Sequence, residues 1–132
     1  MQFLVTVVAT TLIGQASAYY LDKTCSNIQF NPANDVLALD CNNKQGVAVH
    51  QTFDLNTCLQ WNAGSKSIGY GKNFGNACKN CYTEKRFNVE FEGTYTNIIC
   101  TCDGIAKIVH DLGADSHIGN VDGVLTCCDV AC

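Results

Sequence analysis

The sequence is short of positive charge and of long apolar stretches. Lys and Arg together number 8 against 12 Asp and Glu, so the formal net charge is −4 and the isoelectric point is near 5.1. No basic cluster is present that would follow a phosphate backbone. After residue 18 no stretch is apolar for long enough to cross a bilayer as a helix. We therefore expect neither a nucleic-acid partner nor a membrane partner.

Sequence signatures of catalysis are also missing. The chain has no G-x-S-x-G, no H-E-x-x-H and no glycine-rich phosphate loop. Its histidines are His50, His110 and His117. Although His110 is followed by Asp111, neighbouring residues of a strand point to opposite faces and make no catalytic dyad. We predict a protein that is not an enzyme and that uses no cofactor.

The first 18 residues read as a secretory signal peptide. Leu4–Gly14 is an apolar run, and Ala16-Ser17-Ala18 is a small-residue cleavage motif. The segment before the run carries no Lys or Arg, which leaves a buried N-terminal strand as the alternative. Cleavage before Tyr19 would leave residues 19–132 as one secreted, extracellular domain with a modest core.

All ten cysteines follow this segment. An even number of cysteines in an exported chain indicates a disulfide scaffold, and each bridge stabilises by about 2–4 kcal/mol. We expect five bridges and no free thiol. Cys78-x-x-Cys81 and Cys100-x-Cys102 would also suit tetrahedral zinc, but exported cysteines are usually oxidised, so we predict no metal site.

Polar and apolar residues alternate along most of the chain, which is typical of half-buried strands. The alternating segments are Cys25–Phe30, Val36–Cys41 and Val47–Phe53. The first two flank a turn, Asn31–Asp35, that holds the only proline, so they predict a hairpin with Cys25 and Cys41 on its arms. These cysteines can bridge if they face each other. Asp54–Asn56 can cap a short helical turn.

The same unit is written twice. Residues 115–125 (DSHIGNVDGVL) match residues 56–65 (NTCLQWNAGS) further upstream, with Ile118 on Leu59 and Gly123 on Gly64. Cys78–Asn80 echoes Cys25–Asn27, Asn97–Cys102 echoes Ala38–Cys41, and Ile105–Val109 echoes the third strand. We predict repeat 1 at about 19–72, repeat 2 at about 73–126 and a cysteine-rich tail at 127–132. Tyr82–Gly93 is expected to be an insert between strands, and Ser65–Lys72 a loose hairpin.

The second repeat suggests its own bridges. Facing residues in an antiparallel hairpin have a constant index sum, and Cys78–Cys102 and Cys81–Cys100 differ in that sum by only one. Both bridges therefore fit one hairpin if a β-bulge lies between them. Cys58 must then pair with Cys127, Cys128 or Cys132, and the sequence does not choose among them.

Two tandem units, Cys25…Leu37-Ala38-Leu39-Asp40-Cys41 and Cys78…Ile98-Ile99-Cys100-Thr101-Cys102, are each followed by a strand and a D-L-N or N-V-D-G segment. This pattern resembles the cyanovirin-N homology (CVNH) family over nearly the whole mature chain. The resemblance implies an all-β, pseudo-symmetric fold in which the repeats exchange their C-terminal hairpins. It also implies carbohydrate binding, best known for mannose-rich glycans, with one site at each end. A domain-swapped homodimer would use Ser65–Lys72 as its hinge.

The family's first site maps onto three segments of this chain. Its predicted residues are Lys23, Thr24, Asn42, Asn43, Lys44, Asn120, Val121 and Asp122. Their chemistry suits a sugar, because a carboxylate is a strong acceptor for hydroxyl groups and Asn both donates and accepts. The alternative is that Asn120 and Asp122 only form a turn.

The second site departs from the family's pattern. It would use Gln60–Ala63, Lys72–Ala77 and Asp103–Ile105, but Trp61 and Ala63 stand where Asn and Asp are common. Trp61 could stack on a sugar ring, although we favour packing in the core. The prediction is a secreted lectin with one mannose-type glycan site. The alternative is a secreted cysteine-rich interaction or effector protein that keeps the fold without binding sugar.

Overall fold

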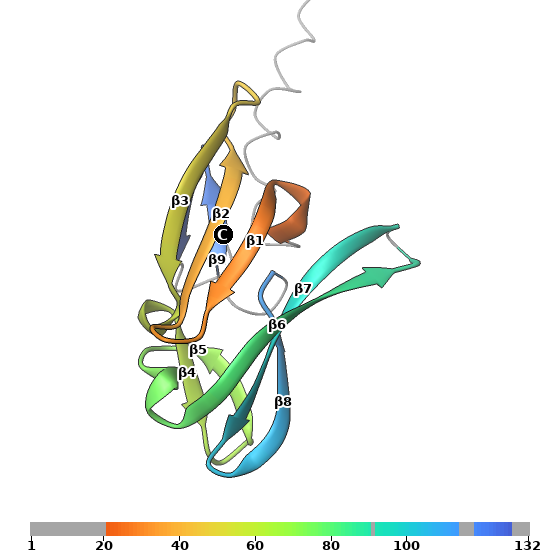
Figure 1. The fold of residues 1–132 in the computed structure, drawn as a ribbon. Coiled ribbons are helices and arrows are strands. Elements are labelled where there is room, and N and C mark those ends of the chain that lie inside the picture. The colour runs from red at the N-terminus through yellow and green to blue at the C-terminus, as the bar shows by residue number, and fades with distance from the viewer. Residues whose placement is uncertain (1–20, 91, 114–117, 128–132) are drawn as a thin grey trace, which may run out of the picture.

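A computed structural model describes residues 21–90, 92–113 and 118–127, which form strands joined by short turns (Figure 1). The strands are β1 (Cys25–Asn31), β2 (Val36–Asn42), β3 (Ala48–Asp54), β4 (Leu59–Asn62), β5 (Ser67–Tyr70), β6 (Cys78–Asn88), β7 (Gly93–Cys102), β8 (Ile105–Asp111), β9 (Ile118–Val121) and β10 (Val124–Cys127). Three single 3₁₀ turns are η2 (Leu21–Lys23), η3 (Leu55–Thr57) and η4 (Phe74–Asn76). The predicted signal peptide lies outside the described residues. Within them no helix is long and apolar enough to cross a membrane.

The strands form four antiparallel sheets in a duplicated order, which confirms the predicted all-β, pseudo-symmetric fold. A three-stranded sheet, β1-β2-β3, and a hairpin, β4-β5, are followed by the sheet β6-β7-β8 and the hairpin β9-β10. The hairpins are exchanged, because β10 contacts β3 whereas β5 contacts β8. We call β1, β2, β3, β9 and β10 the first half of the protein, and β4 to β8 the second half.

A side chain of β3 holds the exchanged hairpin of the first half. Gln51 Oε1 accepts a hydrogen bond from the Leu125 backbone N–H at 2.8 Å, and Gln51 Nε2 donates to the Gly123 carbonyl. Leu125 is 6% exposed and Ile118 is fully buried against the sheet. Hydrogen bonds and apolar burial therefore fix the position of β9-β10 on a sheet formed about seventy residues earlier in the chain.

Four disulfides connect the described cysteines, and no free cysteine is found among them. They are Cys25–Cys41, Cys58–Cys127, Cys78–Cys102 and Cys81–Cys100. Cys25 faces Cys41 in the register of β1 and β2, and Cys78 faces Cys102 in that of β6 and β7. The predicted bulge lies between Lys79 and Tyr82, where Asn80 has a φ of 55°. The fifth predicted bridge involves Cys128 and Cys132, which lie outside the described residues.

The alternating pattern of the sequence places one face of each sheet in the core. In β2, Leu37, Leu39 and Cys41 are fully buried while the residues between them remain partly exposed. Phe74, in η4 at the start of the second repeat, is also fully buried. Asp54 caps η3 by accepting a hydrogen bond from the Asn56 backbone N–H at 2.9 Å, as predicted. Hydrophobic patterning and one cap therefore account for most of the chain's local structure.

The segment Tyr82–Gly93 is not an insert that separates strands, and this prediction was wrong. β6 and β7 pair without a break from Tyr82 opposite Ile99 to Asn88 opposite Gly93. Since β8 pairs with β7 only from Asn97 onward, the outer part of the hairpin is a two-stranded ribbon. We call residues 84–90 and 92–96 the arm; Figure 1 shows it pointing away from the rest of the protein.

Two further segments differ from the sequence-based picture. Ser65–Lys72, expected to be a loose hairpin by itself, contains β5, which is one strand of the β4-β5 hairpin. Cys127, assigned to a tail, is the last residue of β10 and forms the bridge to Cys58. The choice among three C-terminal partners for Cys58 is therefore settled by where β10 ends.

Candidate carbohydrate site

The tip of β9-β10 meets the loop between β2 and β3 at the end of the first half. Asp122 Oδ1 accepts a hydrogen bond from the Lys44 backbone N–H at 2.8 Å. Asn120 Nδ2 donates to the Asn42 carbonyl at 3.0 Å. These residues are 78 positions apart in the sequence. The fold thus brings together the β2–β3 loop and the β9–β10 turn, both of which were predicted to belong to the site.

Backbone conformation explains why the tip carries Asp-Gly. Asp122 has a φ of 52° and Gly123 a φ of 89°, as expected for the two central residues of a tight hairpin turn. A Cβ on Gly123 would lie 3.0 Å from Val49 Cγ2 and 3.1 Å from Asn43 Cβ. The tip therefore presses against the β2–β3 loop, and only glycine fits there without strain.

Two of the predicted site residues shape the loops. Asn43 Oδ1 accepts hydrogen bonds from the Gln45 and Val47 backbone N–H groups, at 3.0 and 2.9 Å. Asn120, only 8% exposed, accepts from the Gly123 N–H at 2.8 Å while it donates to Asn42. Because these amides are engaged in holding the backbone, their main role is to fix the geometry of the site.

The remaining predicted residues leave polar groups at the surface. Asn42, Lys44 and Asp122 are exposed. Among the described residues, the only hydrogen bond found for these three side chains is the one that Asp122 Oδ1 accepts. The Thr24 carbonyl accepts a hydrogen bond from the Asn42 N–H at 2.8 Å, which attaches the segment of Lys23 and Thr24 to the same loop. All three predicted segments therefore meet at one end of the first half, with Val121 53% exposed beside them.

The corresponding end of the second half has a different construction. The turn between β7 and β8 consists of Asp103 and Gly104 alone, whereas residues 43–47 separate β2 from β3. Trp61 is half-buried against the core, as favoured by the sequence, and its Nε1 donates to Asp103 Oδ2 at 2.6 Å. Ala63 offers no side-chain acceptor. The Asp103 carboxylate is thus already engaged with an indole.

The other residues predicted for the second site are dispersed or internal. Phe74 is fully buried and Gly75 packs beside Asp35, so this part of Lys72–Ala77 serves the core. Gln60 Nε2 donates to Asn62 Oδ1 at 2.9 Å, which occupies two of the remaining polar groups. Lys72, Asn73 and Asn76 remain exposed on this segment, but it carries no carboxylate like that of Asp122.

Sequence reasoning missed two features near these sites. Gln51 holds the β9-β10 tip, yet in the sequence it is only one polar residue of an alternating strand. A polar hollow of about 140 Å³ lies between the β1–β2 turn and the start of β6, beside Asp35 and Lys79. Lys79 Nζ already donates to the Gly75 carbonyl at 2.8 Å, and Asp35 Oδ2 accepts from Asn56 Nδ2 at 3.0 Å. The hollow therefore presents few unsatisfied groups to a ligand.

The cysteine motifs are not a zinc site. Cys78 and Cys81 are both in disulfides, with Cys102 and Cys100 respectively, so no thiolate is left to bind metal. In the ranges that the structure describes, no group of three His, Cys, Asp or Glu side chains is placed to hold an ion.

Comparison with known proteins places this geometry in a wider context. A family model described as the CVNH domain matches residues 21–126. Similar solved structures include microvirin in complex with mannobiose, at 21% identity and a TM-score of 0.55, covering 83% of this chain and 99% of that chain. A designed cyanovirin-N homolog lectin has 21% identity, a TM-score of 0.60 and the same coverage. A CVNH protein of Gibberella zeae has 20% identity and a TM-score of 0.56, covering 80% of this chain and 94% of that chain. No curated protein matches the chain significantly.

Proposed function

Because this chain belongs to the CVNH domain family, we propose that it is a lectin that binds a mannose-type glycan at the end of its first half. Membership of a lectin family supports carbohydrate binding without catalysis. The similar structure of microvirin holds mannobiose, which supports mannose as the sugar. The proposed contacts come from Asp122, Asn42, Lys44 and Thr24.

The observation that carries this proposal is the hydrogen bond from the Lys44 N–H to Asp122 Oδ1. This contact orients the carboxylate on a rigid turn and leaves Oδ2 available to accept from a sugar hydroxyl. A carboxylate acceptor forms hydrogen bonds roughly twice as strong as those of a neutral group. The exposed Asn42 amide and Lys44 ammonium supply donors nearby, which suits adjacent hydroxyl groups on one ring.

We assign one binding site rather than two. In the second half the β7–β8 turn is reduced to Asp103 and Gly104, and Asp103 Oδ2 is already engaged by the Trp61 indole at 2.6 Å. A sugar hydroxyl at this end would have to compete with the indole for Asp103 Oδ2.

The protein is proposed to act outside the cell. Four disulfides among the described residues suit an oxidising compartment, and residues 1–18 have the composition of a signal peptide. A domain-swapped homodimer stays a prediction. Its predicted hinge, Ser65–Lys72, contains β5, and sedimentation at two protein concentrations would test the swap.

Glycan-array binding of the oxidised protein tests the lectin function. We expect Asp122→Ala to abolish binding, and Asp122→Asn, which keeps an acceptor for the Lys44 N–H, to weaken it roughly tenfold. Asn tolerates positive φ, so the turn should survive this change. Asp103→Asn, at the opposite end, is the matched control and should bind like the wild type. A wild type that retains no glycan would refute the proposal, and loss of binding in Asp103→Asn would refute the single site.

The alternative function is a secreted interaction or effector protein. It is favoured by the arm, where Phe87 is 61% and Val89 75% exposed, and by the altered second site. A chain with no glycan affinity and an intact fold would support this reading instead.

A further inference from the structure

The arm leaves one strand edge open. β6 lies at the edge of the β6-β7-β8 sheet, and residues 82–87 have no second strand partner among the described residues. On the β7 side, the Leu112 N–H donates to the Thr96 carbonyl at 3.0 Å, and Asp22 of η2 accepts hydrogen bonds from the Thr94 and Thr96 hydroxyls. Figure 1 shows η2 on the β7 side of the arm and open space on the β6 side.

This edge lacks the features by which proteins usually protect a free strand. It has no proline, and its only irregularity, between Lys79 and Tyr82, precedes the arm. Tyr82 and Phe87 are 51% and 61% exposed. A long, regular, partly apolar edge presents unpaired N–H and C=O groups that another strand can satisfy.

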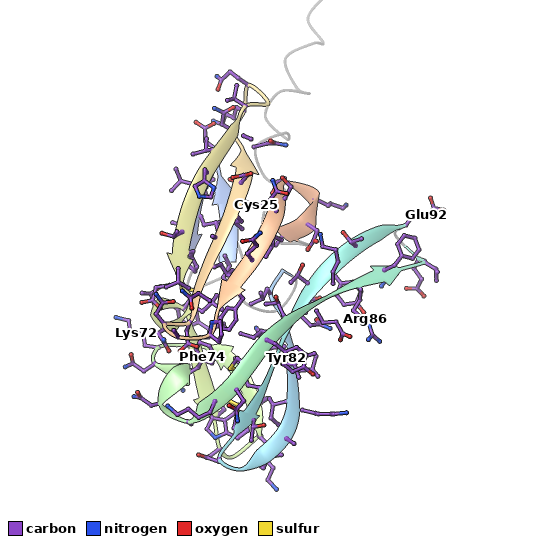
Figure 2. The ribbon with its side chains drawn as sticks, viewed as in Figure 1. Cys25, Lys72, Phe74, Tyr82, Arg86 and Glu92 are labelled. Atoms are coloured by element: carbon purple, nitrogen blue, oxygen red, sulfur yellow. A yellow bond between two sulfur atoms is a disulfide. The ribbon has the colours of Figure 1, made fainter. Side chains whose placement is uncertain are left out.

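Pairing within the arm shows which side chains share a face. Lys85 and Phe87 lie opposite Thr96 and Thr94, and these two threonines bond to Asp22. Alternation therefore places Thr83, Lys85 and Phe87 on the face toward η2. Tyr82, Glu84 and Arg86 lie on the other face; Figure 2 shows Tyr82 and Arg86 along this strand.

We propose that β6 pairs antiparallel with β6 of a second copy of this chain, about a twofold axis at Lys85. A twofold axis normal to the joined sheet keeps each face on its own side, so facing residues differ by an even number. Centring on Lys85 puts Glu84 opposite Arg86 of the second copy, and the symmetry makes this pair twice. Thr83 then lies opposite Phe87 of the second copy, and each exposed ring gains a β-branched neighbour.

The charges along the strand select this register from its neighbours. Centring on Glu84 would place two carboxylates face to face, and centring on Arg86 would oppose two guanidinium groups, both unfavourable. Centring on Lys85 opposes two ammonium groups. However, each Lys85 Nζ lies 3.6 Å from Asp22 Oδ2 of its own chain, and this carboxylate offsets the repulsion.

In the proposed dimer, the two arms form a continuous four-stranded sheet with the order β7-β6-β6-β7. It is independent of the proposed sugar binding, since the arm belongs to the second half and shares no residue with the Asp122 region. It also differs from a domain-swapped dimer, in which the hairpins are exchanged and the β6 edge stays open.

Sedimentation velocity over a concentration series tests the pairing with a charge exchange. We expect the wild type to form dimers. Glu84→Arg and Arg86→Glu alone each make the two pairs between copies repulsive, and also reverse the pair of Arg86 Nη1 with Glu84 Oε1 within each chain, at 3.3 Å. Each should weaken the dimer roughly tenfold or more. The double variant Glu84→Arg/Arg86→Glu restores opposite charges and should recover dimerisation. Lys107→Glu, an exposed charge on β8, is the matched control and should behave as the wild type.

Far-UV circular dichroism and thermal melts would verify that all variants are folded. Amide exchange of the N–H groups in residues 82–87 that point away from β7 should slow as protein concentration rises, because these groups become bonded to the second copy. A wild type that stays monomeric at millimolar concentration would overturn the proposal. So would single variants that dimerise as tightly as the wild type, or a double variant that fails to recover.

Discussion

Asp22 connects the N-terminal turn of the first repeat to the arm of the second. Its carboxylate is only 4% exposed. Thr96 Oγ1 donates to Asp22 Oδ1 at 2.9 Å, and Thr94 Oγ1 donates to Asp22 Oδ2 at 3.2 Å. Lys85 Nζ approaches Asp22 Oδ2 to 3.6 Å but is 54% exposed. Removing this carboxylate therefore tests how strongly η2 is held against β7.

The two hydroxyl contacts should dominate the cost. Hydrogen bonds to a charged group contribute about 1.5–3 kcal/mol each, whereas a solvent-exposed ion pair such as that of Lys85 contributes about 0–1 kcal/mol. Asp22→Ala leaves the Thr96 hydroxyl buried without this acceptor, so we expect the free energy of unfolding to fall by about 3–5 kcal/mol. Asp22→Asn keeps one acceptor oxygen and should lose about 1–2 kcal/mol.

Urea denaturation with intact disulfides, followed by the fluorescence of the single tryptophan, Trp61, measures these losses. Asp54→Ala, which removes the exposed cap of η3, is the comparison and should cost about 1 kcal/mol. The reasoning would be refuted if Asp22→Ala cost no more than Asp54→Ala, or if the Asn and Ala variants of Asp22 were equally stable. Amide exchange in β7 should accelerate selectively in Asp22→Ala.

Two further predictions concern the first half. Leu125→Ala should lower the free energy of unfolding by about 2–5 kcal/mol, because this side chain is 6% exposed. Val124→Ala, at a position that is 58% exposed, should change it little. Equal losses of stability in urea denaturation would contradict this difference. Hydrogen bonds from Asn27 and then His50 lower the pKa of Asp40 below its ordinary value of 3.8. Because the folded-state pKa is the lower one, the stability gained from ionised Asp40 is present above about pH 4 and is lost as the pH falls through the folded-state pKa. Wild type and Asp40→Asn should therefore differ in urea midpoint at pH 6 and converge near pH 2, and a constant difference would refute the assignment.

Local patterns predicted the strands because most of them have one buried face. Leu37, Leu39 and Cys41 alternate with less buried residues in the sequence and in β2. The positions of Cys78, Cys81, Cys100 and Cys102 were enough to predict two bridges and the bulge between them, because one hairpin register must satisfy both. These features could be predicted because each depends only on strands that are neighbours in the sequence and are joined by a turn.

The arm escaped the sequence analysis for the opposite reason. Residues 84–87 are all exposed, so they carry no period-2 signal of a buried face. A row of charged residues therefore suggested an insert between strands, although pairing with β7 keeps these residues extended. Only the completed hairpin shows that the apparent insert lengthens β6.

The family's pattern was enough to locate the proposed site. It did not show which of its residues hold the backbone and which are exposed to a ligand. Asn120 and Asp122 are similar turn-forming residues in the sequence. The structure buries Asn120, which lies in β9, under the loop of Asn42. Asp122 stays at the surface because it lies in the turn after β9, where its φ is 52°. Gln51 likewise acquires its role only when the exchanged hairpin reaches it.

The sequence alone determined the all-β composition, the duplication, three of the four described disulfides and the residues that meet at the first half's end. These features follow from alternation, turn chemistry, cysteine spacing and the resemblance to a family. Tertiary structure decided the partner of Cys58, the engagement of Trp61 with Asp103 and the open edge of β6. Each of these depends on contacts between segments that lie far apart in the chain or on the absence of a neighbouring strand, and no local pattern encodes such distances.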